Sequence, residues 1–310
     1  DTLTYTDTSV FADSVHYDHL DVLIDRDNGH ATFVIKGPQV ALPENSESIV
    51  AAGTRFWPLA VMRDLDDAIL HLRFNETSVG SWIFKTLGDP ELVLAADALL
   101  ARHAEHWFVR EVLLFTERVL KRLDVSARSL IAALEPGSCF AGTLFELALA
   151  CDQSYMLLGQ FEDDETPPAA VALSEHNFGR YRMVNGISRL EARFLDDAQT
   201  LQVLATRQGD LLAAQDAEQA GLVTFIPDDI DWHDELRIVL EARAGFSPDA
   251  LSGMEANLRF PGPETMESKI FSRLSAWQNW IFQRPNAVGD NGALVLYGSG
   301  ERAQFHKQRV

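Results

Sequence analysis

The stretch that most constrains the fold runs from residue 132 to residue 152 and reads AALEPGSCFAGTLFELALACD. Leu130 to Leu134 form a short apolar run at its start, which predicts a buried strand. Small residues from Pro136 to Ser138 predict a turn, and apolar residues at helical spacing follow Gly142. A buried strand that passes through a tight turn into a helix is typical of α/β proteins.

The junction between this strand and this helix is a candidate site for acid–base chemistry. The first backbone N–H groups of a helix have no partner inside the helix, so they can bind a developing negative charge. Glu146 falls in the first turn of the predicted helix, where its carboxylate could transfer a proton. Two interpretations without chemistry stay open: the helix dipole stabilises a carboxylate at this end of a helix, and small residues also suit a tight packing turn.

The rest of the chain alternates between strand and helix patterns. Asp27-Asn28-Gly29 separates two β-branched runs and predicts a hairpin, because Asn and Gly tolerate positive φ. An acidic stretch at 161–168 ends in two prolines and predicts an exposed loop. The remaining patterns predict strands at 20–24, 31–35, 79–85, 171–173 and 222–226, and helices at 59–72, 108–123, 188–195, 213–220, 232–244 and 266–281. This alternation predicts the α/β class.

The same patterns divide the chain into three parts. Residues 1–16 are polar and would bury little surface, so they predict a linker. Residues 17–230 hold the alternating strands and helices and predict one core domain. Residues 231–310 are mostly helical in pattern and end in a polar, glycine-containing stretch, which predicts a helical C-terminal region and tail.

Charge and cysteine content exclude several classes of function. The net charge of −20 argues against nucleic-acid binding, which needs a basic face. No apolar run approaches about 18 residues, so we expect no membrane span. Cys139 and Cys151 are too few for a disulfide scaffold and fit buried positions in a cytoplasmic protein. Their spacing does not suggest a metal site.

Four short motifs follow one another along the chain. Leu94 to Asp97 reads Leu-Ala-Ala-Asp, and residues 146–152 read Glu-Leu-Ala-Leu-Ala-Cys-Asp. Ser174-Glu-His-Asn-Phe-Gly comes next, followed by Ala-Glu-Gln-Ala-Gly-Leu-Val at 217–223. In composition and order these motifs resemble those of the crotonase (enoyl-CoA hydratase/isomerase) superfamily, over roughly residues 20–247. The resemblance implies a crotonase-like ββα spiral core, followed here by the mostly helical C-terminal region.

The resemblance also implies a CoA-thioester substrate and a site of four residues. Crotonases bind the thioester oxygen with two backbone N–H groups, which correspond here to those of Ala96 and Thr143. Their acid and base carboxylates correspond to Glu146 and Glu175. No metal or redox cofactor is implied, because the thioester carbonyl itself activates the substrate. The turn keeps only the first of the superfamily's three glycines, and Thr143 and Leu144 add bulk where a ligand would approach.

Three longer strings, at 106–111, 135–143 and 276–282, resemble a narrower group. They are similar to the C-terminal half of long, two-part crotonases that degrade aromatic acids as CoA esters. This resemblance implies that water opens the ring of 2,3-epoxybenzoyl-CoA, with release of formate and a dehydroadipyl-CoA semialdehyde. The implied partners are the N-terminal half of the same enzyme and further copies in a homo-oligomer. The alternative is a non-catalytic scaffold or dimerisation domain that supports a catalytic N-terminal half.

Overall fold

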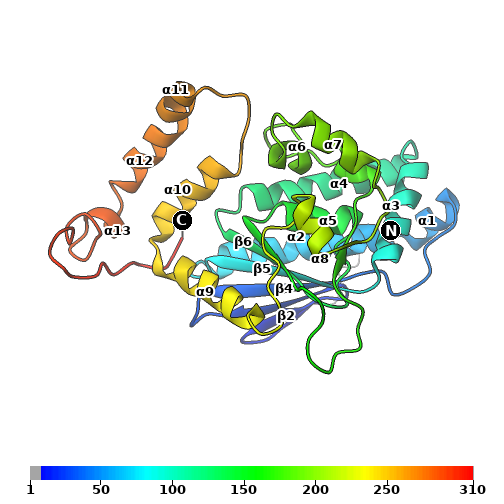
Figure 1. The fold of residues 1–310 in the computed structure, drawn as a ribbon, viewed down its shortest axis with the longest axis horizontal. Coiled ribbons are helices and arrows are strands. Elements are labelled where there is room, and N and C mark those ends of the chain that lie inside the picture. Colours follow the sequence, from blue (N-terminus) through cyan, green and yellow to red (C-terminus); the bar gives the residue numbers. More distant parts are fainter. Residues whose placement is uncertain (1–7, 310) are drawn as a thin grey trace.

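A seven-stranded sheet organises residues 8–309, the part of the chain that the computed structural model describes (Figure 1). The strands lie side by side in chain order. The first four pair antiparallel, and the fourth to the seventh pair parallel. The mixed sheet and its helices confirm the predicted α/β class. The strands are β1 (Ser9–Val10), β2 (Ser14–His16), β3 (Leu20–Asp25), β4 (His30–Lys36), β5 (Ser81–Leu87), β6 (Ser129–Leu134) and β7 (Gln153–Met156).

The hairpin between β3 and β4 forms at the predicted turn. Leu20 pairs with Ile35 and Asp25 pairs with His30, so the turn consists of the four residues between the last pair. Gly29 has a φ of 71°, a conformation that glycine adopts without a steric penalty. The local sequence therefore fixes the register of this antiparallel pair.

The parallel strands are joined by crossover helices, as parallel pairing requires. The predicted apolar stripes at 59–72 and 108–123 fall inside α2 and α4, which pack against each other. Strand β6 is buried along its whole length, which is typical of a central parallel strand. The helices of this region are α1 (Ser46–Ala52), α2 (Trp57–Asn75), α3 (Pro90–Arg102), α4 (Trp107–Asp124) and α5 (Gly142–Leu149), with a 3₁₀ turn, η1 (Gly53–Arg55).

Both faces of the sheet are covered. Side chains alternate along a strand, so Trp82 and Phe84 of β5 enter the main core while Ile83 points to the other face. There Ile83 belongs to a smaller cluster with Trp232 and Val239 of α9 (Trp232–Gly245). Figure 1 shows α9 on the side of the sheet away from α2 and α4.

Two segments differ from the sequence prediction. The strand predicted at 222–226 is wrong, because Phe225 forms only an isolated bridge with Tyr155. Part of the predicted linker, residues 9–16, contributes β1 and β2, since backbone pairing does not require apolar side chains. Residues 1–7 of that linker lie outside the described part of the chain. The boundaries at 17 and 231 stay predictions.

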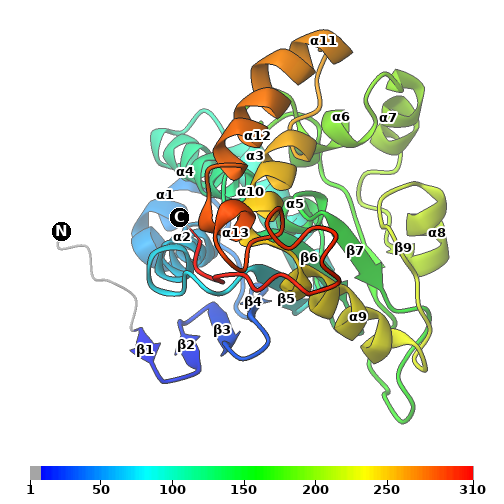
Figure 2. The ribbon, with the colours of Figure 1, turned by 90° about the vertical axis from the view of Figure 1, so that its left-hand side faces the viewer.

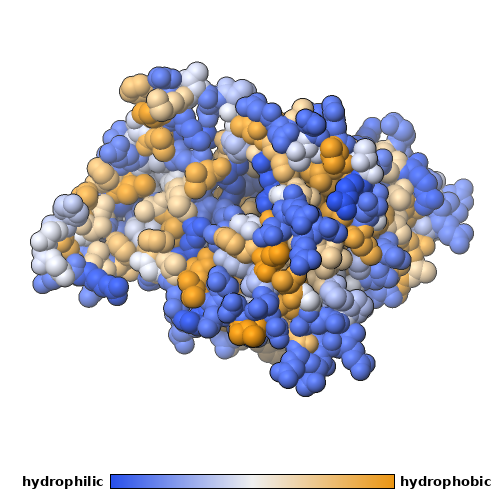
Figure 3. All heavy atoms as spheres, viewed as in Figure 1, coloured by the Kyte–Doolittle hydropathy of each residue, from blue (hydrophilic) through white to orange (hydrophobic). Residues whose placement is uncertain are grey.

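The C-terminal region is mostly helical, as predicted. Its last long helix contains one π-helical turn, η3 (Ile270–Leu274), between α11 (Met266–Lys269) and α12 (Ser275–Ile281). Figure 2 shows α12 beside α10 (Pro248–Leu258), with which it is in contact. Apolar residues appear along these helices on the face seen in Figure 3. The remaining elements are β8 (Ala170–Val171), η2 (Glu175–Asn177), α6 (Arg189–Arg193), α7 (Ala198–Ala205), β9 (Leu212–Ala213), α8 (Ala214–Gln219) and α13 (Pro285–Val288).

Candidate active site

The predicted strand–turn–helix unit forms between β6 and α5. Every residue of α5 is buried, so the apolar pattern of this helix reflects packing on all sides. The N–H of Gly142 donates to the carbonyl of Ala172, 3.0 Å away, which ties the start of α5 to the segment before η2. Glu146 lies one turn deeper in the helix than the sequence indicated. The unit therefore places Glu146 inside the core.

Glu146 is held by two polar side chains. Its carboxylate accepts hydrogen bonds from Nδ2 of Asn177 at 2.7 Å and from Nη1 of Arg189 at 3.0 Å. The second nitrogen of Arg189, Nη2, contacts Oδ1 of Asp124 at 2.8 Å. Burial raises the pKa of Glu146, and the positive charge of Arg189 opposes this increase. Glu146 is thus one end of a buried Glu–Arg–Asp cluster, in which one guanidinium serves two carboxylates.

The backbone N–H of Thr143 has a partner within the chain. It donates to Oδ2 of Asp97 at 2.8 Å, and the Thr143 hydroxyl donates to the other oxygen of the same carboxylate. Ser174 Oγ also donates to Asp97 Oδ2, at 2.6 Å. Because this amide is the predicted donor to a thioester oxygen, a carboxylate of the protein itself occupies the predicted oxyanion position.

The Ala96 amide lies inside a helix and not at its amino end. Ala96 lies in the interior of α3, where backbone N–H groups donate to carbonyls of the preceding turn. The turn that directly follows β5 is Gly88-Asp89, and the N–H of Gly88 donates to the carbonyl of Gly137 at 3.0 Å. Asp89 caps α3 and Pro90 begins it, which is a helix-start signal present in the sequence.

Glu175 is exposed and does not meet Glu146. It lines a surface hollow of about 310 Å³ together with His176, Phe178, Gly179 and Arg180. The contact of this turn with Glu146 comes instead from Asn177, two residues further on. The structure thus brings Thr143 and Glu146 into one buried region but leaves Ala96 within a helix and Glu175 at the surface. The catalytic roles of these four residues stay predictions.

The fold is similar to that of solved enoyl-CoA hydratases. An enoyl-CoA hydratase from Geobacillus kaustophilus HTA426 has a TM-score of 0.63 at 16% identity, covering 95% of this chain and 98% of that one. An enoyl-CoA hydratase/isomerase from Cupriavidus metallidurans CH34 has a TM-score of 0.62 at 16% identity, covering 94% and 98%. The chain has the crotonase fold.

A sequence relative narrows the resemblance within the crotonases. The chain is 50% identical over 308 residues to the benzoyl-CoA-dihydrodiol lyase of Aromatoleum evansii. The match covers 99% of this chain and 55% of the relative, so the chain spans about half the length of that protein. No family model matches the chain. The predicted resemblance to this group of crotonases is confirmed.

Sequence reasoning missed the polar residues that surround Asp97 in this crotonase fold. His176 Nδ1 lies 3.5 Å from Asp97 Oδ1 and 3.3 Å from the hydroxyl of Tyr181, and all three side chains are buried. Tyr181 also lies 3.1 Å from the Thr143 hydroxyl, and burial raises its pKa well above the usual value. No local pattern predicts the contacts of Asn177 and Arg189 with Glu146 or of Tyr181 with Thr143, because these contacts join residues 31 or more positions apart in the sequence.

The described part of the chain offers neither a metal-ligand cluster nor an exposed thiol. Between residues 8 and 309, no group of three or more His, Cys, Asp or Glu residues could hold a metal ion. Both cysteines are buried in the main core, as predicted, and burial raises the pKa of Cys139 to about 11. Across the same residues, no helix is long and apolar enough to span a membrane.

Proposed function

We propose that this chain is one half of a benzoyl-CoA-dihydrodiol lyase and that it supports catalysis by the N-terminal half. The whole enzyme would open the ring of 2,3-epoxybenzoyl-CoA with water and release formate and a dehydroadipyl-CoA semialdehyde. The 50% identity to a lyase of that name, over 99% of the chain, supports the assignment to this enzyme. The reaction needs no metal or redox cofactor in this proposal, since the CoA thioester carries the activating carbonyl.

One observation favours the supporting role over catalysis within this half. The Thr143 amide donates to the Asp97 carboxylate, which also receives the hydroxyls of Thr143 and Ser174. An ionised carboxylate accepts a stronger hydrogen bond than a neutral thioester carbonyl, so a substrate would not readily displace it. The Glu146 carboxylate likewise forms an ion pair with Arg189. Neither the Thr143 amide nor the Glu146 carboxylate is therefore free to act on a substrate.

The same proposal covers assembly and location. We propose a cytoplasmic homo-oligomer in which this half completes the fold of the enzyme. Exposed apolar side chains on and beside the last long helix, among them Met266, Phe271 and Phe282, support burial against another part of the assembly.

Replacing Glu175 tests the supporting role without disturbing the core. In the whole enzyme we expect Glu175→Gln to leave turnover of 2,3-epoxybenzoyl-CoA unchanged, because this side chain is exposed and remote from Glu146. A general acid or base contributes roughly 10²–10⁴-fold to a rate. A loss of that size, with an unchanged circular dichroism spectrum, would show that this half is catalytic. Glu162→Gln, in an exposed loop, is the matched control.

Glu146→Gln tests the buried carboxylate in the same enzyme. We expect lower stability, because Arg189 loses one of its two charged partners. The turnover of the folded fraction should stay normal. If the variant keeps its fold and loses turnover by the factor given above, the alternative holds, in which Glu146 acts as an acid or base in crotonase-type enolate chemistry.

A further inference from the structure

The amino ends of the parallel strands carry a second group of polar residues. This edge of the sheet lies opposite Thr143, which follows the carboxyl end of β6. Arg128 directly precedes β6, and Gly80 directly precedes β5. The last described residues return to this edge, where the N–H of Arg309 donates to the carbonyl of Thr77 at 3.0 Å.

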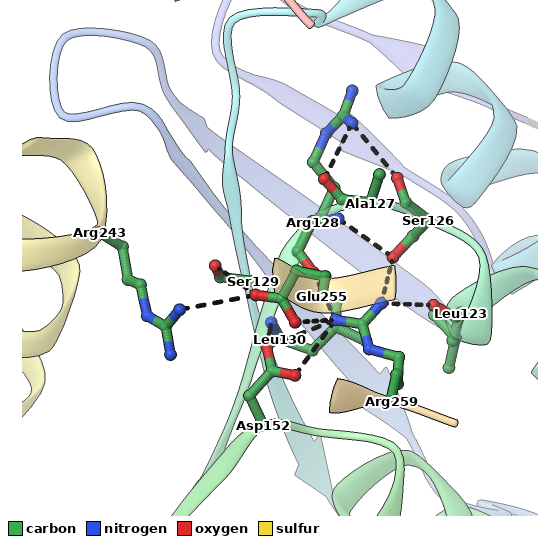
Figure 4. A network of polar contacts seen from close by, with 10 residues as sticks. All are labelled: Leu123, Ser126, Ala127, Arg128, Ser129, Leu130, Asp152, Arg243, Glu255 and Arg259. Atoms are coloured by element: carbon green, nitrogen blue, oxygen red, sulfur yellow. Dashed lines mark hydrogen bonds and ion pairs between the residues drawn. The ribbon is translucent and has the colours of Figure 1, made fainter. Parts of the chain in front are cut away.

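Arg128 is a buried guanidinium without an acidic partner. The residue is 3% exposed, and its Nε has no hydrogen-bond partner. Its Nη1 donates only to the carbonyls of Ser126 and Ala127, over long distances of 3.3 and 3.5 Å. Figure 4 shows this guanidinium pointing away from the carboxylates of Asp152 and Glu255. Between residues 8 and 309, none of the ion pairs formed includes Arg128.

A second arginine, Arg309, lies at the same edge of the sheet. Arg309 packs over Gly80 so closely that a Cβ atom there would lie 2.1 Å from Nη2 of Arg309. Its Nε is also unpartnered, and its Nη1 donates only to the carbonyl of Lys307 at 3.5 Å. Burial, together with the positive charges of Arg309 and Arg73, lowers the pKa of Arg128 to about 9. The guanidinium groups of Arg128 and Arg309 therefore repel each other.

The nearest acids do not neutralise this cluster. Asp249 and Glu255 attract Arg309 from a distance, but Asp249 pairs with Arg284 and Glu255 pairs with Arg259. Apart from the ring of Trp82, whose centroid lies 5.9 Å from Cζ, the charge of Arg128 has no side-chain partner among the described residues. A buried charge without an acidic partner is costly, and this cost is unexpected in a chain with a net charge of −20. An anion bound between the guanidinium groups would remove this free-energy cost.

We infer that Arg128 and Arg309 form a binding site for a small oxyanion of the phosphate class. Guanidinium groups donate pairs of hydrogen bonds that match phosphate oxygens, and several positive charges favour a dianion over a carboxylate. A hollow of about 130 Å³ is lined by Arg309, Lys307 and Gly80, among others, whereas Arg128 does not line it. Its size suits inorganic phosphate or a terminal phosphate group, and not a whole nucleotide. The site is independent of the proposed function.

Binding of inorganic phosphate to the purified protein tests the site. We expect phosphate to raise the melting temperature at constant ionic strength, whereas chloride has no such effect, because only the folded state has the site. Arg128→Gln should raise the phosphate Kd at least tenfold by calorimetry. It should also leave the protein as stable as before, or more stable, without phosphate, since an unpaired buried charge is removed. Arg237→Gln, on the exposed surface of α9, is the matched control.

Two further variants and a competition experiment complete the test. If Arg128→Gln does not fold, Arg309→Gln and Gly80→Ala disturb the site from the surface, and each should weaken phosphate binding. Competition by glycerol phosphate would identify a phosphate monoester as an alternative source of the same group. Phosphate that stabilises the Arg128 variant as much as the unsubstituted protein, or that stabilises neither, would overturn the inference.

Discussion

Two clusters, each of one arginine, one glutamate and one aspartate, serve different parts of the molecule. In the inner cluster, Arg189 joins Glu146 and Asp124, and all three side chains are about 1% exposed. In the outer cluster, Arg259 joins Glu255 of α10 to Asp152, which follows α5 and precedes β7 (Figure 4). The inner cluster fixes helices of the core to one another, whereas the outer cluster attaches the C-terminal region to the sheet.

The two clusters differ in their access to solvent. Asp152 reaches the surface, and two hollows of about 570 and 290 Å³ are lined by both Glu255 and Arg259. Glu255 accepts from Ser129 Oγ at 3.0 Å and lies 3.6 Å from Arg243. Burial and the charge of Asp152 raise the pKa of Glu255 to about 8. Glu146, the glutamate of the crotonase-like motif, is thus buried in the core and paired with Arg189. Glu255, which can titrate near neutral pH, helps to attach the C-terminal helices to the sheet.

The largest effect is expected when the inner cluster loses its cation. Arg189→Met leaves Glu146 and Asp124 buried without a positive partner. We expect a loss of about 3–5 kcal/mol in the free energy of unfolding, measured by urea denaturation. A loss below about 1 kcal/mol would mean that water or a proton compensates the two carboxylates, and the distinction between the clusters would fail.

The matching change in the outer cluster should cost less. Arg259→Met leaves Asp152 near solvent and Arg243 near Glu255, so we expect a loss of about 2 kcal/mol. Hydrogen exchange should increase in α10 while α5 stays protected, because only α10 is attached through this arginine. Equal deprotection of both helices would show that the two clusters form a single unit.

The smallest effect is a change in pH dependence. The Glu255 carboxyl has a pKa of about 8 in the folded protein and an ordinary value of 4.5. Its contribution to stability is therefore complete below pH 4.5 and is lost as the pH rises towards 8, with a slope of at most about 1.4 kcal/mol per pH unit. Glu255→Gln should flatten this part of the profile in urea denaturations between pH 5 and 9. Glu241→Gln, an exposed control on α9, should retain it.

Local patterns predicted the elements that depend on local chemistry. The hairpin at Asp27–Gly29, the stripes of α2 and α4 and the strand–turn–helix unit at 130–149 all form, because turn residues and apolar periodicity act over a few positions. The strand predicted at 222–226 is wrong because Leu222 and Val223 are buried by packing in the main core and not by sheet pairing.

The candidate site could not be predicted to the same extent. Motif matching selected the Ala96 amide as a donor to the thioester oxygen, but Asp89 and Pro90 start α3 earlier and leave Ala96 within the helix. The Thr143 amide donates a hydrogen bond to Asp97, which is 46 residues away in the sequence, and Glu146 pairs with Arg189, which is 43 residues away. Such long-range pairs have no spacing rule, so the sequence can supply the residue types of a site and not their partners.

The short strands at the start of the described chain have a consequence for self-association. Without β1 and β2, the six residues of β3 would form the margin of the sheet and present unpaired backbone groups to other molecules. The present margin is β1, which is two residues long and offers little template for a foreign strand. A segment whose composition predicted a linker therefore acts as a cover that limits aggregation through the sheet.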